Sequence, residues 1–322
     1  MPNARLRVIA LLNASAGTVE RQGGGTLRDV LAAAFEKHGV AATLEFLPGS
    51  ELKSAAERAR QQVVDGKLDA IVVGGGDGSV RTVASVLAGS DIPLGVLPLG
   101  TLNHFARDLG ISFVVEEAVA VIAAGADRAV DVGEVNDTIF INNSSIGLYP
   151  YLVLGRERRR RSKRLSKWAA MILTIPGVLR NLPLFRLNIL VGSVVEPCRS
   201  PCVFIGNNEY RISAPGLGTR DSLDRGELCL YVARTQGGLA MVWLACRSIL
   251  GLVSQQRDLR IFRGTTADIS SRRRRLLVAF DGEVETMQSP LHYKIRPGAL
   301  RVFAPPIGPA HNAARATESQ PA

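Results

Sequence analysis

Residues 69–79 constrain the fold more than any other part of the chain, because an apolar run leads directly into a glycine-rich loop. Asp69-Ala-Ile-Val-Val73 predicts a strand buried on both faces, as strands of a parallel sheet are. Gly74-Gly75-Gly76-Asp77-Gly78-Ser79 follows, and the next residues, to about residue 88, predict a helix. A buried strand, a loop and a helix in this order are typical of an α/β domain.

The same alternation runs through the first part of the chain. A helix is predicted at 114–124, further helices lie between the predicted strands, and those strands are at 5–12, 41–47, 69–73 and 92–97. Strands that alternate with helices at this spacing form a parallel sheet with helices on both faces. We therefore expect an α/β domain with a parallel sheet over residues 1–132.

The pattern changes after about residue 130. Helices are predicted only at 156–180 and 237–254, and short β-like runs occur at 129–135, 139–146, 186–195, 201–206, 227–233, 275–281, 292–296 and 299–303. This pattern favours an antiparallel β-sandwich, expected over residues 133–306. The last segment, 307–322, is rich in Pro, Ala, Ser and Thr, which predicts a disordered tail.

The charge balance favours an anionic partner. The 322 residues include 39 basic and 29 acidic side chains, a net charge of +10. Nucleic acid, an acidic membrane surface and phosphates all fit such a surplus. Aromatic residues make up only 5%, which weighs against base stacking and predicts no nucleic-acid partner. The apolar stretches at 168–179 and 238–254 are both too short or too interrupted for a membrane-spanning helix.

A basic run lies at residues 156–164, with seven positive side chains and one negative. Trp168 and an apolar stretch follow it, which favours a helix lying on an anionic bilayer; a solvated charged face is the alternative. A second run, Arg272–Arg275, is predicted at a hairpin tip. The four cysteines form no CxxC pair and no histidine lies near them in sequence. This predicts no zinc site and is compatible with a reducing cytosol.

The glycine loop at 74–78 predicts a phosphate or nucleotide site. Glycines let backbone N–H groups approach an anion, and a helix N-terminus adds favourable partial charge. Asp77 within the loop can orient hydroxyls or metal-bound phosphates. Because Asp77 is a loop residue, we expect its side chain to contribute little to the stability of the fold. The loop lacks the Lys-Ser/Thr of a Walker A motif and the last glycine of GxGxxG. A structural tight turn is the alternative.

The next strand end supplies a second polar loop, Gly100-Thr101-Leu102-Asn103. Ligands of open α/β sheets lie at the carboxyl ends of strands, so Thr101 and Asn103 can reach the same ligand as Asp77. Helix capping at the start of 102–109 is the alternative for both residues.

In chain order these motifs resemble the bacterial diacylglycerol kinase family, lipid kinases whose nucleotide fold is similar to that of NAD kinases. The Gly-Gly-Asp-Gly-Thr pattern is matched by Gly75–Ser79, with Ser in place of Thr. Asn13–Gly17 and Gly100–Asn103 match two further patterns, the first of them loosely. Asp131-Val132-Gly133 matches an Asp-Leu-Gly element, and Asp281-Gly282-Glu283 matches Asp-Gly-Glu in full. The matches cover residues 13–283.

The resemblance implies ATP bound in the crevice between two domains, Mg²⁺ and a lipid hydroxyl as acceptor. Glu283 would accept the hydroxyl proton with Asp281 beside it, although Asp281-Gly282 also fits a plain hairpin turn. Asp131 would be a metal ligand. The residues implied to bind the nucleotide are Asn13, Gly74, Gly75, Gly76, Asp77, Gly78, Ser79, Val80, Arg81, Gly100, Thr101 and Asn103.

Two residues depart from the family pattern. His104 stands where an acid is usual, so it can hydrogen-bond phosphate or cap a helix. Leu223-Asp224-Arg225-Gly226 replaces Leu-Asp-Asp-Gly, in which the second aspartate binds a structural magnesium. Arginine cannot bind magnesium, but its guanidinium can supply the positive charge of the ion.

The resemblance thus implies an ATP-dependent lipid kinase that is cytoplasmic and peripheral at the inner face of the membrane. An NAD-kinase-like small-molecule kinase and a non-catalytic nucleotide- or lipid-binding regulator are the alternatives. Diacylglycerol, a sphingoid base and other lipid alcohols all stay open as acceptors. The oligomeric state is open as well, a homodimer included.

Overall fold

The computed structural model describes residues 5–15, 24–151, 153–154, 184–211, 218–234 and 258–306. The chain divides into two compact units. Unit 1 comprises Met1–Val130 and Ala299–Ala322, and unit 2 comprises Asp131–Gly298. The chain passes from one unit to the other within β5 (Asp127–Val135) and within β18 (Leu291–Phe303).

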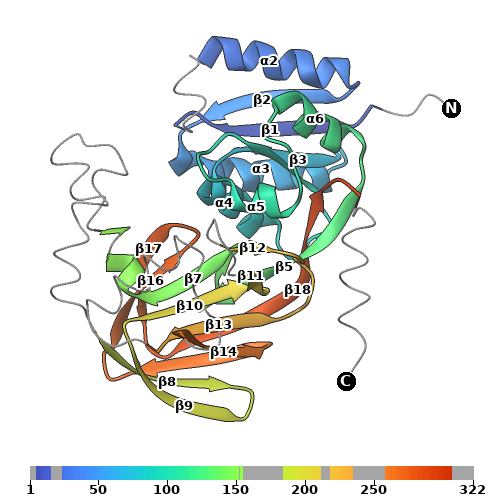
Figure 1. Ribbon diagram of the computed structural model, residues 1–322. Coiled ribbons are helices and arrows are strands. Elements are labelled where there is room, and N and C mark those ends of the chain that lie inside the picture. The colour runs from blue at the N-terminus through green and yellow to red at the C-terminus, as the bar shows by residue number, and fades with distance from the viewer. Residues whose placement is uncertain are drawn as a thin grey trace, which may run out of the picture. The chain divides into compact units, whose positions relative to one another are not determined.

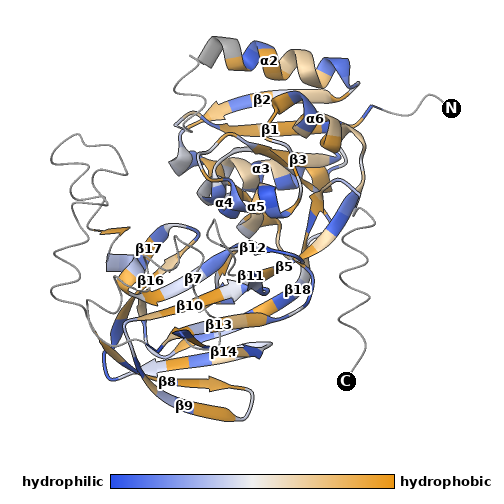
Figure 2. Cartoon of the chain, in the orientation of Figure 1, coloured by the Kyte–Doolittle hydropathy of each residue, from blue (hydrophilic) through white to orange (hydrophobic). Residues whose placement is uncertain are grey.

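Unit 1 contains a parallel sheet whose strands follow the order β2-β1-β3-β4 (Figure 1). The bounds are β1 Arg7–Asn13, β2 Ala41–Leu47, β3 Ala70–Gly75 and β4 Leu94–Pro98. The end of β18 joins next to β4, where Val302 pairs with Leu94 in parallel. Consecutive residues of β1 and β3 are buried, so both faces of the sheet are covered, and both strands carry the orange of hydrophobic residues in Figure 2.

The helices of unit 1 pack in two pairs, α2 with α6 and α3 with α4. Their bounds are α2 Gly24–Lys37, α3 Leu52–Val64, α4 Asp77–Leu87, α5 His104–Asp108 and α6 Val115–Ala123, with a short 3₁₀ turn η1 at Gly49–Glu51. Helices α2 and α6 contact β2 and β4, whereas α3 and α4 contact β1 and β3. The predicted α/β fold with a parallel sheet is confirmed.

Unit 2 is built from antiparallel strands in two sheets. One contains β18, β15, β8 and β9 in this order, with β5 beside β18 and β6 beside β5. The other follows the order β14-β13-β10-β7-β16-β17. A short pair, β11 with β12, is separate. The bounds are β6 Thr138–Phe140, β7 Asn143–Gly147, β8 Phe185–Val191, β9 Val194–Ser200, β10 Cys202–Asn207, β11 Tyr210–Arg211, β12 Thr219–Arg220, β13 Leu228–Ala233, β14 Leu259–Gly264, β15 Thr266–Ser271, β16 Arg275–Phe280 and β17 Glu283–Gln288.

The main hydrophobic core of unit 2 draws on both sheets. Leu187 and Ile189 of β8 and Tyr293 of β18 join Val203 of β10 and Val278 of β16 in one buried cluster. Two sheets that share a core in this way form a sandwich. The predicted antiparallel β-sandwich is therefore confirmed.

Several element boundaries differ from the predicted ones. The predicted strand 186–195 is the hairpin β8–β9, which turns at Gly192 with a φ of +59°. The predicted strands 292–296 and 299–303 are the single strand β18, which carries residues from 299 onward into unit 1. The second unit therefore ends at Gly298, where the sequence predicted 306, and it begins at Asp131, where the sequence predicted 133.

Three predicted segments lie outside the described residues: the helices at 156–180 and 237–254 and the tail at 307–322. Within the described part of the chain, no helix has the length and apolar character needed to span a membrane.

Candidate functional site

Three loops in unit 1 follow neighbouring parallel strands. Asn13 ends β1, Gly76–Ser79 follow β3, and Gly100–Asn103 follow β4. The carboxyl ends of adjacent parallel strands lie at one edge of a sheet, so these loops are neighbours. Asn13 Nδ2 donates a hydrogen bond to Ser79 Oγ at 2.8 Å, which joins residues 66 positions apart. The structure thus brings together the residues in which the sequence predicted a nucleotide site.

The glycines allow these loops to approach one another closely. A Cβ on Gly100 would overlap the Cα of Gly76, and one on Gly75 would lie 2.6 Å from Ser79 Oγ. Any side chain at either glycine would therefore push the loops apart. Backbone that carries no side chains can be approached closely by phosphate groups.

Asp77 links the β3 loop to the β4 loop. Its carboxylate accepts the backbone N–H of His104 at 3.1 Å and that of Phe105 at 3.0 Å. Asp77 therefore caps the N-terminus of α5, and the expectation that it contributes little to stability is corrected. His104 provides its backbone N–H to this cap.

Asn103 stabilises the β4 loop from within. It has a left-handed φ of 49°, and its side-chain oxygen accepts the N–H of Gly100 at 3.0 Å. Its Nδ2 donates to the carbonyl oxygens of Pro98 and Gly100. Asn103 makes no side-chain cap to α5, so the capping alternative considered for this residue is wrong. Thr101 in the same loop is exposed.

Two residues of the predicted nucleotide site belong to the interior of unit 1. The Val80 side chain is only 3% exposed, and only its backbone is left for a ligand. Gly74 lies within β3, where a Cβ would meet the side chain of Leu12. Arg81 follows on α4 and is half-buried. The Val80 side chain therefore packs in the core of unit 1, and a nucleotide contact by its backbone stays a prediction.

In unit 2, Asp281 and Gly282 form the two-residue turn between β16 and β17. Their φ angles are +47° and +86°, as a type I′ hairpin turn requires. The Asp281 carboxylate accepts the backbone N–H groups of Ile141 and Asn142 at 2.8 Å each and that of Asn143 at 3.3 Å. Asp281 therefore fixes the chain between β6 and β7.

A buried arginine holds the same segment from its carbonyl side. Arg220 is only 3% exposed and donates to the carbonyl oxygens of Ile141 at 2.8 Å and Asn207 at 3.0 Å, and to Asn142 Oδ1 at 2.7 Å. Asn207 Nδ2 in turn donates to the carbonyl oxygens of Asp131 and Ile141. Sequence reasoning missed this network, since its members lie far apart in the chain and belong to no local motif.

Asp131 is almost fully buried, at 1% exposure. One carboxylate oxygen accepts the N–H of Gly298 at 2.8 Å and the other that of Gly226 at 2.6 Å. Within the described ranges, no three His, Cys, Asp or Glu side chains gather as metal ligands. The Asp131 carboxylate therefore joins three chain segments, and its role as a metal ligand stays a prediction.

Glu283 is the first residue of β17 and pairs across the hairpin with Phe280. It is exposed, whereas Asp281, two residues earlier, is half-buried. The fixed turn at Asp281 and Gly282 therefore sets the backbone position from which the Glu283 carboxylate extends.

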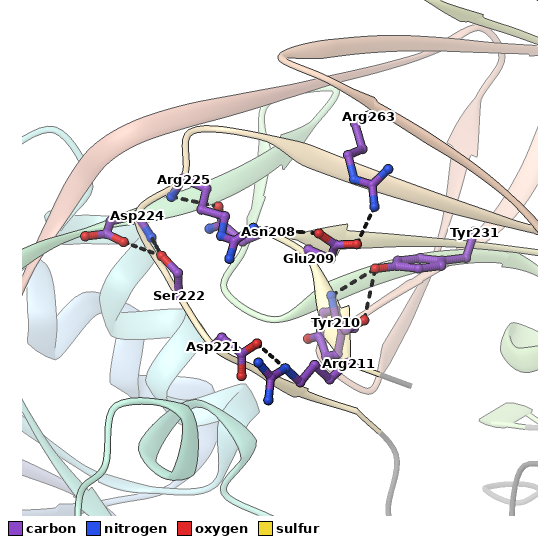
Figure 3. Close-up of polar contacts among 10 residues, drawn as sticks. All are labelled: Asn208, Glu209, Tyr210, Arg211, Asp221, Ser222, Asp224, Arg225, Tyr231 and Arg263. Carbon is purple, nitrogen blue, oxygen red and sulfur yellow. Dashed lines mark hydrogen bonds and ion pairs between the residues drawn. The ribbon is translucent and has the colours of Figure 1, made fainter. Parts of the chain in front are cut away.

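Arg225 belongs to a polar cluster with Glu209 and Arg263 (Figure 3). Its guanidinium lies 3.7 Å from a Glu209 carboxylate oxygen, and its backbone N–H donates to Asn208 Oδ1 at 3.0 Å. Arg263 also pairs with Glu209 and has its pKa raised by that carboxylate. Arginine side chains thus surround Glu209, and Arg225 supplies positive charge at the position where the family pattern has a magnesium-binding aspartate.

The described cysteines, Cys198, Cys202 and Cys229, are free thiols. Burial raises the pKa of Cys198 and of Cys202 to about 11, and burial beside Glu227 and Glu209 raises that of Cys229 to about 12. All three are therefore protonated at neutral pH and are poor nucleophiles or metal ligands.

Comparison with known proteins supports the reading of the motifs. Residues 7–135 match the family model of the diacylglycerol kinase catalytic domain. The chain is 27% identical over 265 residues to "Uncharacterized protein sll0036" of Synechocystis, a match covering 79% of this chain and 59% of that protein. It is 38% identical over 98 residues to "Probable lipid kinase YegS-like" of Klebsiella pneumoniae, a match covering 30% of this chain and 33% of that protein.

A solved structure shares the fold. The crystal structure of a diacylglycerol kinase from Bacillus anthracis superposes with a TM-score of 0.64 and 23% sequence identity, covering 93% of this chain and 97% of that one. The matches to the curated relatives span 59% and 33% of their length.

Proposed function

We propose that this chain, whose residues 7–135 match the diacylglycerol kinase catalytic domain, is an ATP-dependent lipid kinase acting on the free hydroxyl of a neutral lipid such as diacylglycerol. The observation that carries the proposal is the contact between the glycine loops after β3 and β4. This contact, the matched family and the predicted phosphate site all concern the same residues. A relative named as a lipid kinase supports the acceptor class.

In this proposal ATP binds at the loops of unit 1. The first N–H groups of α4 lack acceptors inside the helix and face the triphosphate. Gly76 and Gly100 admit the phosphates close to the backbone, and Asn103 keeps the β4 loop in the required shape. Asp77 is a positioning residue that holds the two loops in register through α5.

Glu283 is proposed as the proton acceptor in unit 2. The lipid hydroxyl oxygen forms a bond to the γ-phosphorus while the bond from that phosphorus to the β–γ bridging oxygen breaks. The hydroxyl proton passes to the Glu283 carboxylate, and ADP leaves. Asp281 suits this role less, because its oxygens already accept three backbone N–H groups.

Mg²⁺ is proposed to enter with the nucleotide. Mg²⁺ typically retains water and substrate phosphates as ligands and takes one or two carboxylates. This fits a chain whose described residues bring no three ligand side chains together. When bound, the ion would neutralise charge on the phosphates.

The proposal also places the protein in the cytoplasm, at the inner face of the membrane where its substrate lies. The basic run at 156–164 is proposed to contact anionic lipid there; this run lies outside the described residues.

Transfer of labelled γ-phosphate from ATP tests the proposal. The acceptors are diacylglycerol, a sphingoid base, another lipid alcohol and NAD. Glu283→Gln keeps the shape and removes the basicity, so turnover falls about 10²- to 10⁴-fold while ATP affinity is unchanged. Glu285→Gln, two residues along the same strand and also exposed, is the matched control and keeps wild-type turnover.

Each alternative function predicts a different result. Labelling of NAD and of no lipid would assign a small-molecule kinase. ATP binding without transfer to any acceptor would assign a regulator. Equal turnover in Glu283→Gln and wild type would remove Glu283 as the base.

A further inference from the structure

Six exposed arginines gather in unit 2 where β8, β9 and the β15–β16 turn meet. We call them the arginine cluster: Arg186, Arg199, Arg272, Arg273, Arg274 and Arg275. Arg186 of β8 lies directly opposite Arg199 of β9. Ser271 of β15 pairs with Leu187, so the next residue, Arg272, follows beside Arg186. The register of the three neighbouring strands therefore places Arg199, Arg186 and Arg272 side by side across the sheet.

This arrangement is unfavourable for the isolated protein. Like charges directly opposite each other on paired strands destabilise a sheet. Throughout the described ranges, none of the six arginines forms an ion pair with a carboxylate; Arg273 instead stacks over the Phe185 ring at 5.0 Å. Elsewhere in unit 2, arginines form ion pairs with acidic side chains, as Arg260 does with Glu196. Because no described carboxylate compensates its positive charge, the cluster is available to an external anion.

The same hairpin also exposes apolar side chains. Val195 is 64% exposed; Val194 is 53% exposed but points to the other face of β9. Val195 lies four residues before Arg199, so both project from the face of β9 that points away from the core. Leu190 of β8 pairs with Val195.

We infer that this outer face of the β8–β9 hairpin, together with the arginine cluster, docks on a bilayer that contains anionic phospholipid. Cations beside exposed apolar side chains match a surface that offers phosphate headgroups above acyl chains. The exposed Val195 beside these arginines favours a bilayer over nucleic acid, which would need aromatic or hydrogen-bonding groups to contact bases. The inference deepens the proposed lipid kinase function, whose acceptor lies in a bilayer.

Co-sedimentation of the full chain with vesicles, without ATP, tests docking. Vesicles of phosphatidylcholine containing phosphatidylglycerol are compared with phosphatidylcholine alone. Each cation near an anionic surface is worth about fivefold in binding, so R186Q/R199Q/R272Q binds about 100-fold more weakly. The matched control K53Q/R58Q/R60Q removes three exposed cations from α3 of unit 1 and keeps most of the binding. Equal losses in both triple variants would overturn the inference, because net charge alone would explain them.

Two further variants separate the contributions. V195S keeps every charge and weakens binding severalfold through lost apolar contact. Replacing Arg158, Arg159, Arg160 and Arg161 by Ala weakens binding through the other basic run, and R186Q/R199Q/R272Q in that background weakens it further. No added loss in this background would overturn the inference.

Three more measurements distinguish docking from other roles. The unfolding midpoint of R186Q/R199Q/R272Q stays level or rises, because the like-charge pair is gone; a lower midpoint accompanying the loss of binding would instead assign the arginines a structural role. Binding of a DNA duplex as tight as vesicle binding, lost in the same variant, would assign a nucleic-acid site. Phosphorylation of a water-soluble short-chain diacylglycerol is unchanged in this variant. Wild-type vesicle binding without any kinase activity would sustain docking and reject the proposed function.

Discussion

The glycine loops of unit 1 and the hydrogen-bonded side chains of unit 2 position the backbone around their candidate functional residues by opposite means. In unit 1, Gly76 and Gly100 bring two backbones together by the absence of side chains. In unit 2, the buried side chains of Arg220 and Asp131 and the half-buried side chain of Asp281 hold backbone segments in place through hydrogen bonds. One region therefore depends on steric room and the other on the satisfaction of buried polar groups.

This difference predicts how each region fails. A side chain added in unit 1 pushes loops apart and weakens the ligand site, whereas most of the sheet beneath stays packed. A side chain removed in unit 2 leaves buried donors or acceptors unpaired, which lowers the stability of the unit itself. Binding and stability should thus respond separately to substitutions in the two units.

Arg220→Met should have the largest effect on stability. It removes the Arg220 hydrogen bonds to the carbonyl oxygens of Ile141 and Asn207 and to Asn142 Oδ1, of which the Ile141 carbonyl keeps its bond from Asn207 Nδ2. The loss of this buried cation lowers the free energy of unfolding by about 3 to 5 kcal/mol. Denaturant unfolding measures the change. The control, Arg211→Gln, removes an exposed ion pair with Asp221 and changes stability by less than about 1 kcal/mol. Equal effects of the two substitutions would refute the role given to Arg220.

Gly100→Ala should affect ligand binding more than folding. Its Cβ would overlap Gly76, so the loops separate at a cost of about 1 to 3 kcal/mol and ATP affinity falls at least tenfold. Isothermal titration with ATP measures the affinity. Gly66→Ala, at a φ of +71° with no neighbouring atom within 4 Å, costs about 1 to 2 kcal/mol of backbone strain but leaves ATP affinity unchanged. If Gly66→Ala lost as much ATP affinity as Gly100→Ala, lower protein stability, and not separation of the loops, would explain the loss in both variants.

Asp77→Asn and Asp281→Asn form a matched pair across the two units. Each keeps the size of the side chain but turns one acceptor oxygen into a donor, so each lowers unfolding free energy by about 1 to 2 kcal/mol. Only Asp77→Asn also weakens ATP binding, because Asp77 orders the β4 loop through α5. Titration and unfolding are measured on both proteins. ATP affinity that falls equally in the two variants would contradict the division of roles.

The local features of this protein were predictable from its sequence. The apolar run at 69–73 and the glycines after it determine a buried strand and a tight loop through interactions between near neighbours. The hairpin turn at Asp281-Gly282 has the same local origin, since both residues tolerate positive φ. The family resemblance added the order of these motifs, and the family model of the diacylglycerol kinase catalytic domain matches the part of the chain at residues 7–135.

Only the tertiary structure decided which partners the polar side chains have. Asp77 appeared to be a loop residue facing a ligand, but packing brings α5 to its carboxylate and makes it a cap. Asp131 accepts a hydrogen bond from Gly298, which lies 167 residues away in the chain. Arg220 donates a hydrogen bond to Ile141, which lies 79 residues away, and no local pattern encodes either contact. The arginine cluster likewise exists because strand register places Arg186 opposite Arg199. Local sequence fixes backbone conformation through short-range sterics, whereas the burial and pairing of a charged group depend on what distant segments bring beside it.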